Sequence, residues 1–147
     1  MKKTHPGKFF RQEEEATLVN AIKEAEAKSS GEIRVHLTKC CDGSPEEAGA
    51  KLFEKLGMTR TAERNGILIY LALKSRKFAI LGDRGIHEKV GADFWYAIRD
   101  AMQEEFRRGE FVKGLLHGIQ TCGAKLGRYF PHRADDHNEL PNDLSQE

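Results

Sequence analysis

The sequence predicts an α/β domain in which layers of helices surround a small mixed sheet. Helix-like and strand-like patterns follow one another in the order helix, strand, helix, strand, strand, helix, helix. One segment, 67–73, is apolar at every position, which is typical of a strand covered on both faces. The 147 residues correspond to one domain that is large enough to bury a core of its own.

The first half of the domain predicts a helix, a strand and a second helix. Apolar residues recur on one stripe over 12–29, opposite Glu and Lys, as in a surface helix. Strict alternation over 32–38 predicts a half-buried strand. The second helix begins after Ser44, a good N-cap that precedes a proline, and ends at Gly57.

The second half predicts a hairpin followed by two helices. A turn of three residues joins strand 67–73 to strand 77–81. Repeated glycines then predict a loop over 82–91. Asp93 is placed to cap the third helix, and the last helix is expected from about 110 to 126.

Composition and charge exclude several classes of protein. The chain has 39% hydrophobic and 32% charged residues, the balance of a globular protein rather than a disordered or collagen-like one. Lys and Arg number 24 against 23 Asp and Glu, so the formal net charge is +1. A protein that follows nucleic-acid phosphates normally carries a basic excess, so no nucleic-acid partner is expected.

Charge also divides the chain into regions. Residues 1–11 carry four basic side chains and no acidic one, whereas the last fifteen residues carry five acidic side chains and one basic one. We expect a basic N-terminal arm over 1–11, a single domain over 12–130 and an acidic, disordered tail over 131–147.

No segment predicts a secretory signal or a membrane span. The longest apolar run has seven residues, whereas a membrane-spanning helix needs about 20. Three cysteines cannot form an even disulfide framework, so we expect reduced thiols, a soluble chain and a cytoplasmic location. A redox role for the adjacent Cys40 and Cys41 stays open.

The connections bring acidic residues to one end of the predicted sheet. Strands 32–38 and 67–73 are joined through a helix and should run parallel, whereas the tight turn makes 77–81 antiparallel. The starts of the first two strands and the end of the third then meet. The acidic residues that lie at this end, or on the loop leaving it, are Glu32, Glu63, Asp83, Glu88 and Asp93.

This acidic end suggests the hypothesis of a divalent-cation site, because Ca²⁺ and Mg²⁺ prefer several carboxylate or carbonyl oxygens, but the spacing of the acids is diffuse. The structural alternative is that Asp93 only caps its helix and Asp83 only serves a turn. The spacing matches no EF-hand, P-loop or serine-hydrolase motif. His87 lies in the same loop and could act as an acid, a base or a nucleophile.

A series of short motifs links this sequence to a known family. The motifs are Ser-Gly-Glu-Ile-Arg-Val at 30–35, Leu-Phe-Glu-Lys-Leu-Gly at 52–57, Arg-Asn-Gly-Ile-Leu-Ile at 64–69, Lys-Phe-Ala-Ile-Leu-Gly-Asp-Arg-Gly-Ile at 77–86, Gly-Ile-His-Glu-Lys-Val-Gly at 85–91 and Phe-Arg-Arg-Gly-Glu-Phe at 106–111. In this order the chain resembles the TPM domain family, named for thylakoid, photosystem-repair and channel-modulating members. The likeness covers 12–127 and is greatest to the stand-alone soluble bacterial branch.

The resemblance implies an α/β/α sandwich that binds a divalent cation, Ca²⁺ or Mg²⁺, and serves regulation or assembly. It also implies a LemA-type or other protein partner and, as an alternative function, weak metal-assisted acid phosphatase activity. The metal ligands that it indicates are Asp83, Asp93, Asn65, Glu63 and Glu88. Many members carry Asp-Asn-Gly where this chain has Arg-Asn-Gly at 64–66, so a cation replaces one candidate ligand.

A third possible function is that of a metal-free protein-interaction module. It would need an exposed apolar patch, which aromatic residues near the two ends of the domain could supply. Packing of these side chains onto the domain is the favoured alternative. The residues concerned are Phe9, Phe10, Tyr129 and Phe130.

Overall fold

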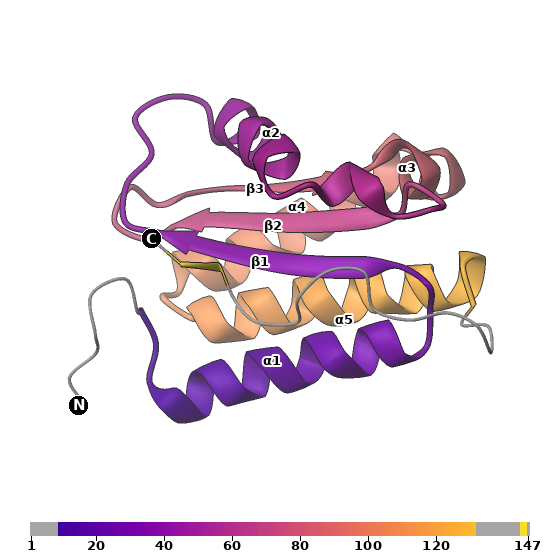
Figure 1. The fold of residues 1–147 in the computed structure, drawn as a ribbon. Coiled ribbons are helices and arrows are strands. Elements are labelled where there is room, and N and C mark those ends of the chain that lie inside the picture. The colour runs from indigo at the N-terminus through magenta and orange to yellow at the C-terminus, as the bar shows by residue number, and fades with distance from the viewer. Residues whose placement is uncertain (1–8, 132–144, 147) are drawn as a thin grey trace.

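The computed structural model describes residues 9–131 and 145–146 of the chain (Figure 1). Its helices and strands are, in chain order, α1 (Gln12–Ala27), β1 (Glu32–Thr38), α2 (Pro45–Lys55), β2 (Gly66–Ala72), β3 (Lys77–Gly82), α3 (Arg84–Val90), α4 (Ala92–Arg107), α5 (Phe111–Tyr129) and β4 (Ser145–Gln146). A short 3₁₀ turn, η1 (Met58–Arg60), follows α2. All of the expected helices and strands are present, and α3 and β4 are additional.

The sheet is mixed, with the strand order β3-β2-β1-β4. β1 and β2 pair in parallel, with Glu32 opposite Gly66, and β3 pairs antiparallel to β2, with Gly82 opposite Ile67. The two-residue β4 joins β1 in parallel. The predicted parallel pair and the predicted hairpin strand are therefore confirmed.

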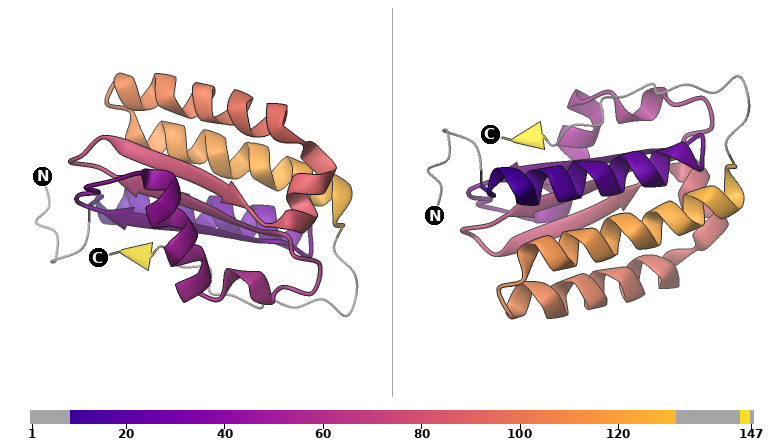
Figure 2. Two further views of the ribbon diagram at one scale, coloured as in Figure 1. Left: turned by 90° about the horizontal axis from the view of Figure 1, so that it is seen from above. Right: turned by 90° about the horizontal axis from the view of Figure 1, so that it is seen from below.

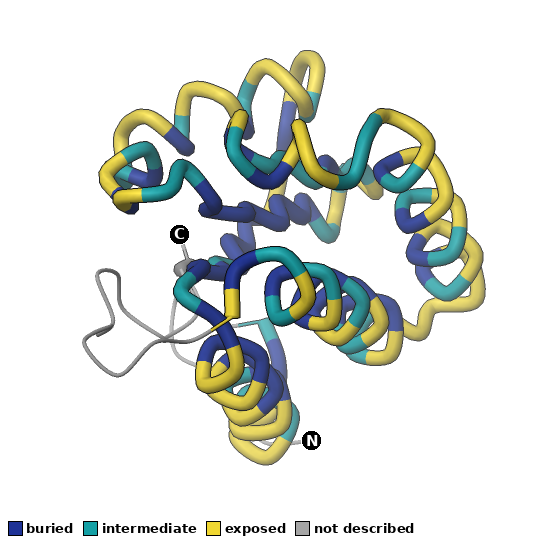
Figure 3. The backbone as a smooth tube through the Cα atoms, turned by 90° about the vertical axis from the view of Figure 1, so that its right-hand side faces the viewer, coloured by how far each residue is buried: buried dark blue, intermediate teal, exposed yellow. Residues whose placement is uncertain are grey.

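Helices cover both faces of the sheet (Figures 1 and 2). α1, α5 and α4 lie side by side on one face, and α2 lies on the other. The core consists mainly of aliphatic side chains between the sheet and the first group of helices. Figure 3 shows buried residues along the strands and alternating buried and exposed residues along the helices. A smaller cluster formed by Phe53, Met58 and Leu68 lies under α2. The predicted α/β/α sandwich is thus confirmed.

The first strand is more buried than its pattern predicts. We expected the polar positions of β1 to face solvent, but only Arg34 is partly exposed. Glu32 and His36 are 2% and 5% exposed, and the His36 ring stacks on Tyr70 of β2 at a centroid distance of 5.9 Å. The prediction of a half-buried strand is therefore wrong. Alternation shows that one face of a strand is polar, but it does not show whether other elements cover that face.

The loop predicted over 82–91 is wrong as well, because most of it forms α3. The Asp83 side chain accepts a hydrogen bond from the Arg84 backbone N–H at 2.8 Å and caps this helix. Gly91, with a φ of 80°, is both the C-cap of α3 and the N-cap of α4. Asp93 therefore lies in the first turn of α4 and is not its cap. A carboxylate in that turn still stabilises the helix through its dipole.

The two ends of the domain pack onto its body. Phe10 and Phe130 are both less than a tenth exposed and belong to the main core, and Phe9 and Tyr129 pack against it. The terminal aromatic residues therefore form no exposed patch. Residues 1–8 of the expected basic arm, and most of the expected acidic tail over 131–147, lie outside the described residues. No helix in the described part of the chain is both long and apolar enough to cross a membrane.

Candidate functional site

The candidate site lies where β1 and β2 begin and β3 ends. The strand register places the starts of β1 and β2 next to each other, with the end of β3 beside them. We call the residues that line this end of the sheet the rim: Ser30, Glu63, Arg64, Asn65 and Asp83. Of the five acidic residues expected to meet here, Glu63 and Asp83 lie at the rim and Glu32 begins β1. The other two, Glu88 and Asp93, lie on α3 and α4.

An ion pair between Arg64 and Asp83 is the central contact of the rim. The Arg64 Nε donates to Asp83 Oδ2 at 2.6 Å, and Arg64 Nη2 donates to Oδ1 at 2.9 Å. The Asp83 side chain is 7% exposed, whereas that of Arg64 is 32% exposed. The hydrogen bond to Asp83 raises the pKa of Arg64, and the charge of Glu54 adds to this effect. The rim thus already holds one cationic group on its most buried carboxylate.

Local backbone geometry places Arg64 for this contact. Arg64 has a φ of 53°, in the left-handed region, and its carbonyl accepts a hydrogen bond from the Gly85 N–H at 2.8 Å. A Cβ at position 85 would overlap the carbonyl oxygens of Glu63 and Arg64, so only glycine allows α3 to approach this turn so closely. The glycine that predicted a loop is therefore required by packing.

A chain of hydrogen bonds joins the other rim residues. Asn65 Nδ2 donates to Ser30 Oγ at 3.2 Å, and Ser30 Oγ donates to Glu63 Oε2 at 2.8 Å. Asn65 is fully buried, and its Oδ1 accepts no hydrogen bond from any described residue. An unpartnered buried carbonyl oxygen is uncommon, because it loses its hydration without compensation.

The ion pair of the rim opens into a hollow between α2 and the end of β3. Its volume is about 200 Å³, and its polar walls are formed by Glu54, Thr59, Arg64 and Asp83. Apart from Arg64, the polar side chains that line this hollow carry oxygen atoms. Such an arrangement favours positive charge at this position.

The predicted metal ligands separate into two groups. Asp83, Asn65 and Glu63 lie at the rim, whereas Glu88 on α3 and Asp93 on α4 are exposed. Among residues 9–131 and 145–146, no three His, Cys, Asp or Glu side chains are close enough to hold a metal ion. The rim is thus not a complete ligand shell, and metal binding by the five residues stays a prediction.

Glu26 is a buried carboxylate that sequence reasoning missed. It is 4% exposed, and its Oε2 accepts a hydrogen bond from the Ile33 N–H of β1 at 2.8 Å. Burial raises the pKa of Glu26 to about 8, and the nearby charge of Glu32 contributes to the same direction. A signal was available, since Glu26 follows Ile22 by four positions and so lies on the apolar stripe of its helix.

His87 is oriented by a tryptophan. Its Nδ1 accepts a hydrogen bond from Trp95 Nε1 at 3.0 Å, while the residue as a whole is exposed. Because Nδ1 acts as the acceptor, the proton of the neutral ring is on Nε2. A role for His87 as an acid, a base or a nucleophile stays a prediction.

Comparison with known proteins identifies the family. The profile described as the TPM domain matches residues 4–125, most of the chain. The chain belongs to the TPM domain family. No curated protein matches it. The assignment covers every residue of the rim, so the rim is part of the TPM domain itself.

Solved structures share the fold of this TPM domain. The BA42 protein from the psychrophilic bacterium Bizionia argentinensis, determined by NMR, is 42% identical; the match covers 96% of this chain and 97% of that one, at a TM-score of 0.87. The N-terminal domain of a P. gingivalis protein is 24% identical over 84% and 82% of the two chains, at 0.68. The N-terminal domain of cg2496 from Corynebacterium glutamicum is 16% identical over 90% and 84%, at 0.65. The last two show the fold alone.

Proposed function

We propose that this TPM domain binds a divalent cation, Ca²⁺ or Mg²⁺, at Asp83, and that the cation displaces Arg64. The observation that supports this proposal best is the ion pair itself. A nearly buried carboxylate holds a positive group in an open hollow, with the second acid Glu54 in the same wall. A site that favours a guanidinium in this position also favours another cation.

The chemistry of the hollow suits hard cations. Carboxylate and hydroxyl oxygens are available from Asp83, Glu54 and Thr59, and water can complete the shell, as it commonly does for Mg²⁺ and Ca²⁺. The affinity should be weak, because few carboxylates are present and two charge-assisted hydrogen bonds to Arg64 must break. We expect a Kd of roughly 0.1–1 mM, the range of Ca²⁺ sites with few charged ligands.

A regulatory role would follow from the position of Asp83. Its side chain caps α3, and α3 packs against α4 and α5. Exchange of Arg64 for a cation would change the hydrogen bonding at the start of this helix and release the Arg64 side chain to solvent. A protein partner, of the LemA type or another kind, would then recognise the cation-bound form of this surface.

Thermal unfolding in Ca²⁺ or Mg²⁺ tests the proposal. A ligand that binds only the folded state at about ten times its Kd stabilises it by roughly 1.4 kcal/mol, which corresponds to a rise in Tm of about 3–5 °C. We expect Asp83→Asn to abolish this rise. Arg64→Gln should increase the rise, because the variant removes the competing cation and leaves Asp83 without its ion pair.

Matched variants make the test specific. Asp100→Asn removes an exposed acid of α4 and should leave the cation-dependent rise unchanged. The same titration of Glu63→Gln, Glu88→Gln and Asp93→Asn examines the other predicted acidic ligands, and loss of the rise would add that residue to the shell. If neither the parent chain nor Arg64→Gln gains stability in about 10 mM cation, the proposal is wrong.

A further inference from the structure

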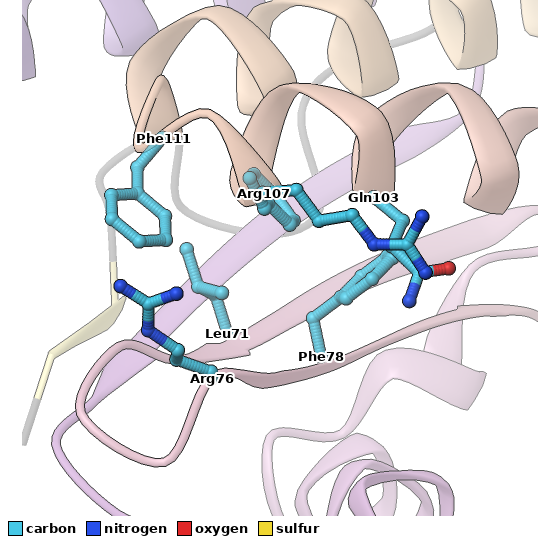
Figure 4. Close-up of a pocket in the computed structure, with 7 residues that line it drawn as sticks. Leu71, Arg76, Phe78, Gln103, Arg107 and Phe111 are labelled. Carbon is cyan, nitrogen blue, oxygen red and sulfur yellow. The ribbon is translucent and has the colours of Figure 1, made fainter.

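A second pocket lies at the opposite end of the sheet from the rim, beside the β2–β3 hairpin (Figure 4). We call it the hairpin pocket. Its volume is about 230 Å³, and it lies between the sheet and the point where α4 ends and α5 begins. No residue of the rim lines it, so its chemistry is separate from that of the proposed cation site.

The floor and walls of the hairpin pocket are apolar. They consist of Leu71, Phe78, Phe106 and Phe111, each from a different helix or strand. The Phe78 and Phe106 rings meet edge to face at a centroid distance of 4.9 Å, and the Phe106 and Phe111 rings stack at 5.6 Å. A Cβ at Gly114 would overlap the Phe106 ring, so the absence of a side chain at position 114 leaves the space that this ring occupies. The apolar surface is therefore preformed by packing.

The polar groups of the hairpin pocket are cationic or neutral. Arg76 and Arg107 line it together with the amide of Gln103, and all three side chains belong to exposed residues. Figure 4 shows the Arg107 guanidinium beside Gln103, and that of Arg76 on the other side of the pocket. Within the described part of the chain, neither guanidinium has a hydrogen-bond or ion-pair partner. Two positive groups thus border an apolar hollow, and the described residues that line it include no acid.

Backbone features support the same conclusion. Arg76 has a φ of 58°, a left-handed conformation that glycine or asparagine adopts more easily. This conformation belongs to the turn that joins β2 to β3, and it sets the point from which the Arg76 side chain leaves the backbone. Phe111 is the first residue of α5, and the N-cap residue Glu110 provides no side-chain cap. The positive end of the α5 dipole therefore adds to the charge of the two arginines.

We propose that the hairpin pocket binds a small amphipathic anion. Its compact aromatic or aliphatic part would contact the phenylalanine rings, and its carboxylate or phosphate would be bound by Arg76 and Arg107. Guanidinium groups suit both anions, because their planar N–H forks match paired oxygens. An apolar cavity of about 150 Å³ holds benzene, so the larger hairpin pocket suits one ring or two fused rings.

Binding of naphthalene-2-carboxylate, followed by ¹⁵N–¹H chemical-shift changes, tests this proposal. We expect saturable changes for residues 71–78 and 103–111, with a Kd of roughly 1 mM for a ligand of this size. Naphthalene-2-methanol, a neutral analogue, should bind about tenfold more weakly. Added salt should weaken binding of the acid but not of the alcohol, because it screens exposed charges. Parallel titration of 2-naphthyl phosphate decides between a carboxylate and a phosphate as the preferred group.

Charge-removing variants assign the effect to the two arginines. Arg76→Gln and Arg107→Gln should each weaken binding of the acid about two- to fivefold, and the double variant about tenfold. Arg128→Gln, which removes an exposed arginine near the end of α5, should have no effect. Both target side chains are exposed, so the spectra should remain those of the folded domain. Equal binding of acid and alcohol, shift changes elsewhere, or unchanged binding in the double variant would each overturn the proposal.

Discussion

At the scale of single residues, the most unusual group is the carboxylate of Glu26. It binds the Ile33 N–H at the edge of β1, where the short β4 does not reach. Its other oxygen, Oε1, is buried and has no hydrogen-bond partner among the described residues. The pKa of Glu26 is raised to about 8, chiefly by burial, so the folded state keeps a proton that the unfolded state loses near 4.5.

The stability of the domain should therefore depend on Glu26 and on pH. The folded state binds more protons between about pH 4.5 and 8, so this group makes stability fall as pH rises through that range. Glu26→Gln keeps an acceptor for Ile33 and removes the charge. We expect its Tm to exceed that of the parent by about 5–10 °C at pH 9, and to match it near pH 5. Calorimetry at the two pH values measures the difference.

Glu24→Gln is the matched control for this prediction. Glu24 lies on the same helix, is exposed and should behave like the parent at both pH values. An equal rise at pH 9 in the Glu24 variant would assign the effect to net charge and contradict a role for the buried carboxylate.

At the scale of elements, α3 depends on one glycine. Its first turn lies against the Glu63–Arg64 backbone, and the Gly85 N–H donates to the Arg64 carbonyl. Carbonyl groups cannot move aside as a flexible side chain can. The ion pair of the rim is therefore linked to the packing of a single backbone segment.

Gly85→Ala should lower the free energy of unfolding by about 1–3 kcal/mol, the usual cost of forcing atoms into a packed region. Urea unfolding measures it. Gly43→Ala is the control, because a Cβ there would meet no atom within 4 Å, and it should change stability by no more than about 0.5 kcal/mol. If Gly85→Ala is equally harmless, the close approach of α3 to the rim is incorrect.

At the scale of the whole molecule, β2 lies at the centre of three layers. All seven of its residues are buried. Ile69 belongs to the core on the side of α1, α4 and α5, whereas Leu68 belongs to the smaller cluster beneath α2. Successive side chains of a strand point to opposite faces, so this pair samples both interfaces of the sheet.

Leu68→Ala and Ile69→Ala should each destabilise the domain by about 2–5 kcal/mol, the range for aliphatic truncations in a core. Tyr96→Ala, at a position 58% exposed, should cost much less. Chemical unfolding of the three variants provides the measurement. A small effect for Leu68→Ala alone would mean that α2 does not cover its face of the sheet.

Much of the fold was predictable because local sequence patterns indicate most of its helices and strands. The continuous apolar run of β2 and the Ser44 cap of α2 are local signals, and both were confirmed. α3 was missed, since Gly85 is needed for a close contact with the distant Glu63 and Arg64 backbone and not for a loop. The connections between the strands were enough to predict that Glu63, Asn65 and Asp83 meet at one end of the sheet. They did not predict that Arg64 forms an ion pair with Asp83.

The sequence by itself determined the order of all helices and strands except α3 and β4, the direction of β1, β2 and β3, and the end of the sheet where Glu63, Asn65 and Asp83 meet. Periodicity and connection length are properties of the chain, so these conclusions needed no coordinates. The tertiary structure decided that Arg64 forms an ion pair with Asp83, that Glu26 is buried and that Arg76 and Arg107 border one apolar pocket. Those outcomes depend on which side chains meet across different elements, because burial, hydrogen bonds and nearby charges set the relative stability of the charged and neutral forms of a group.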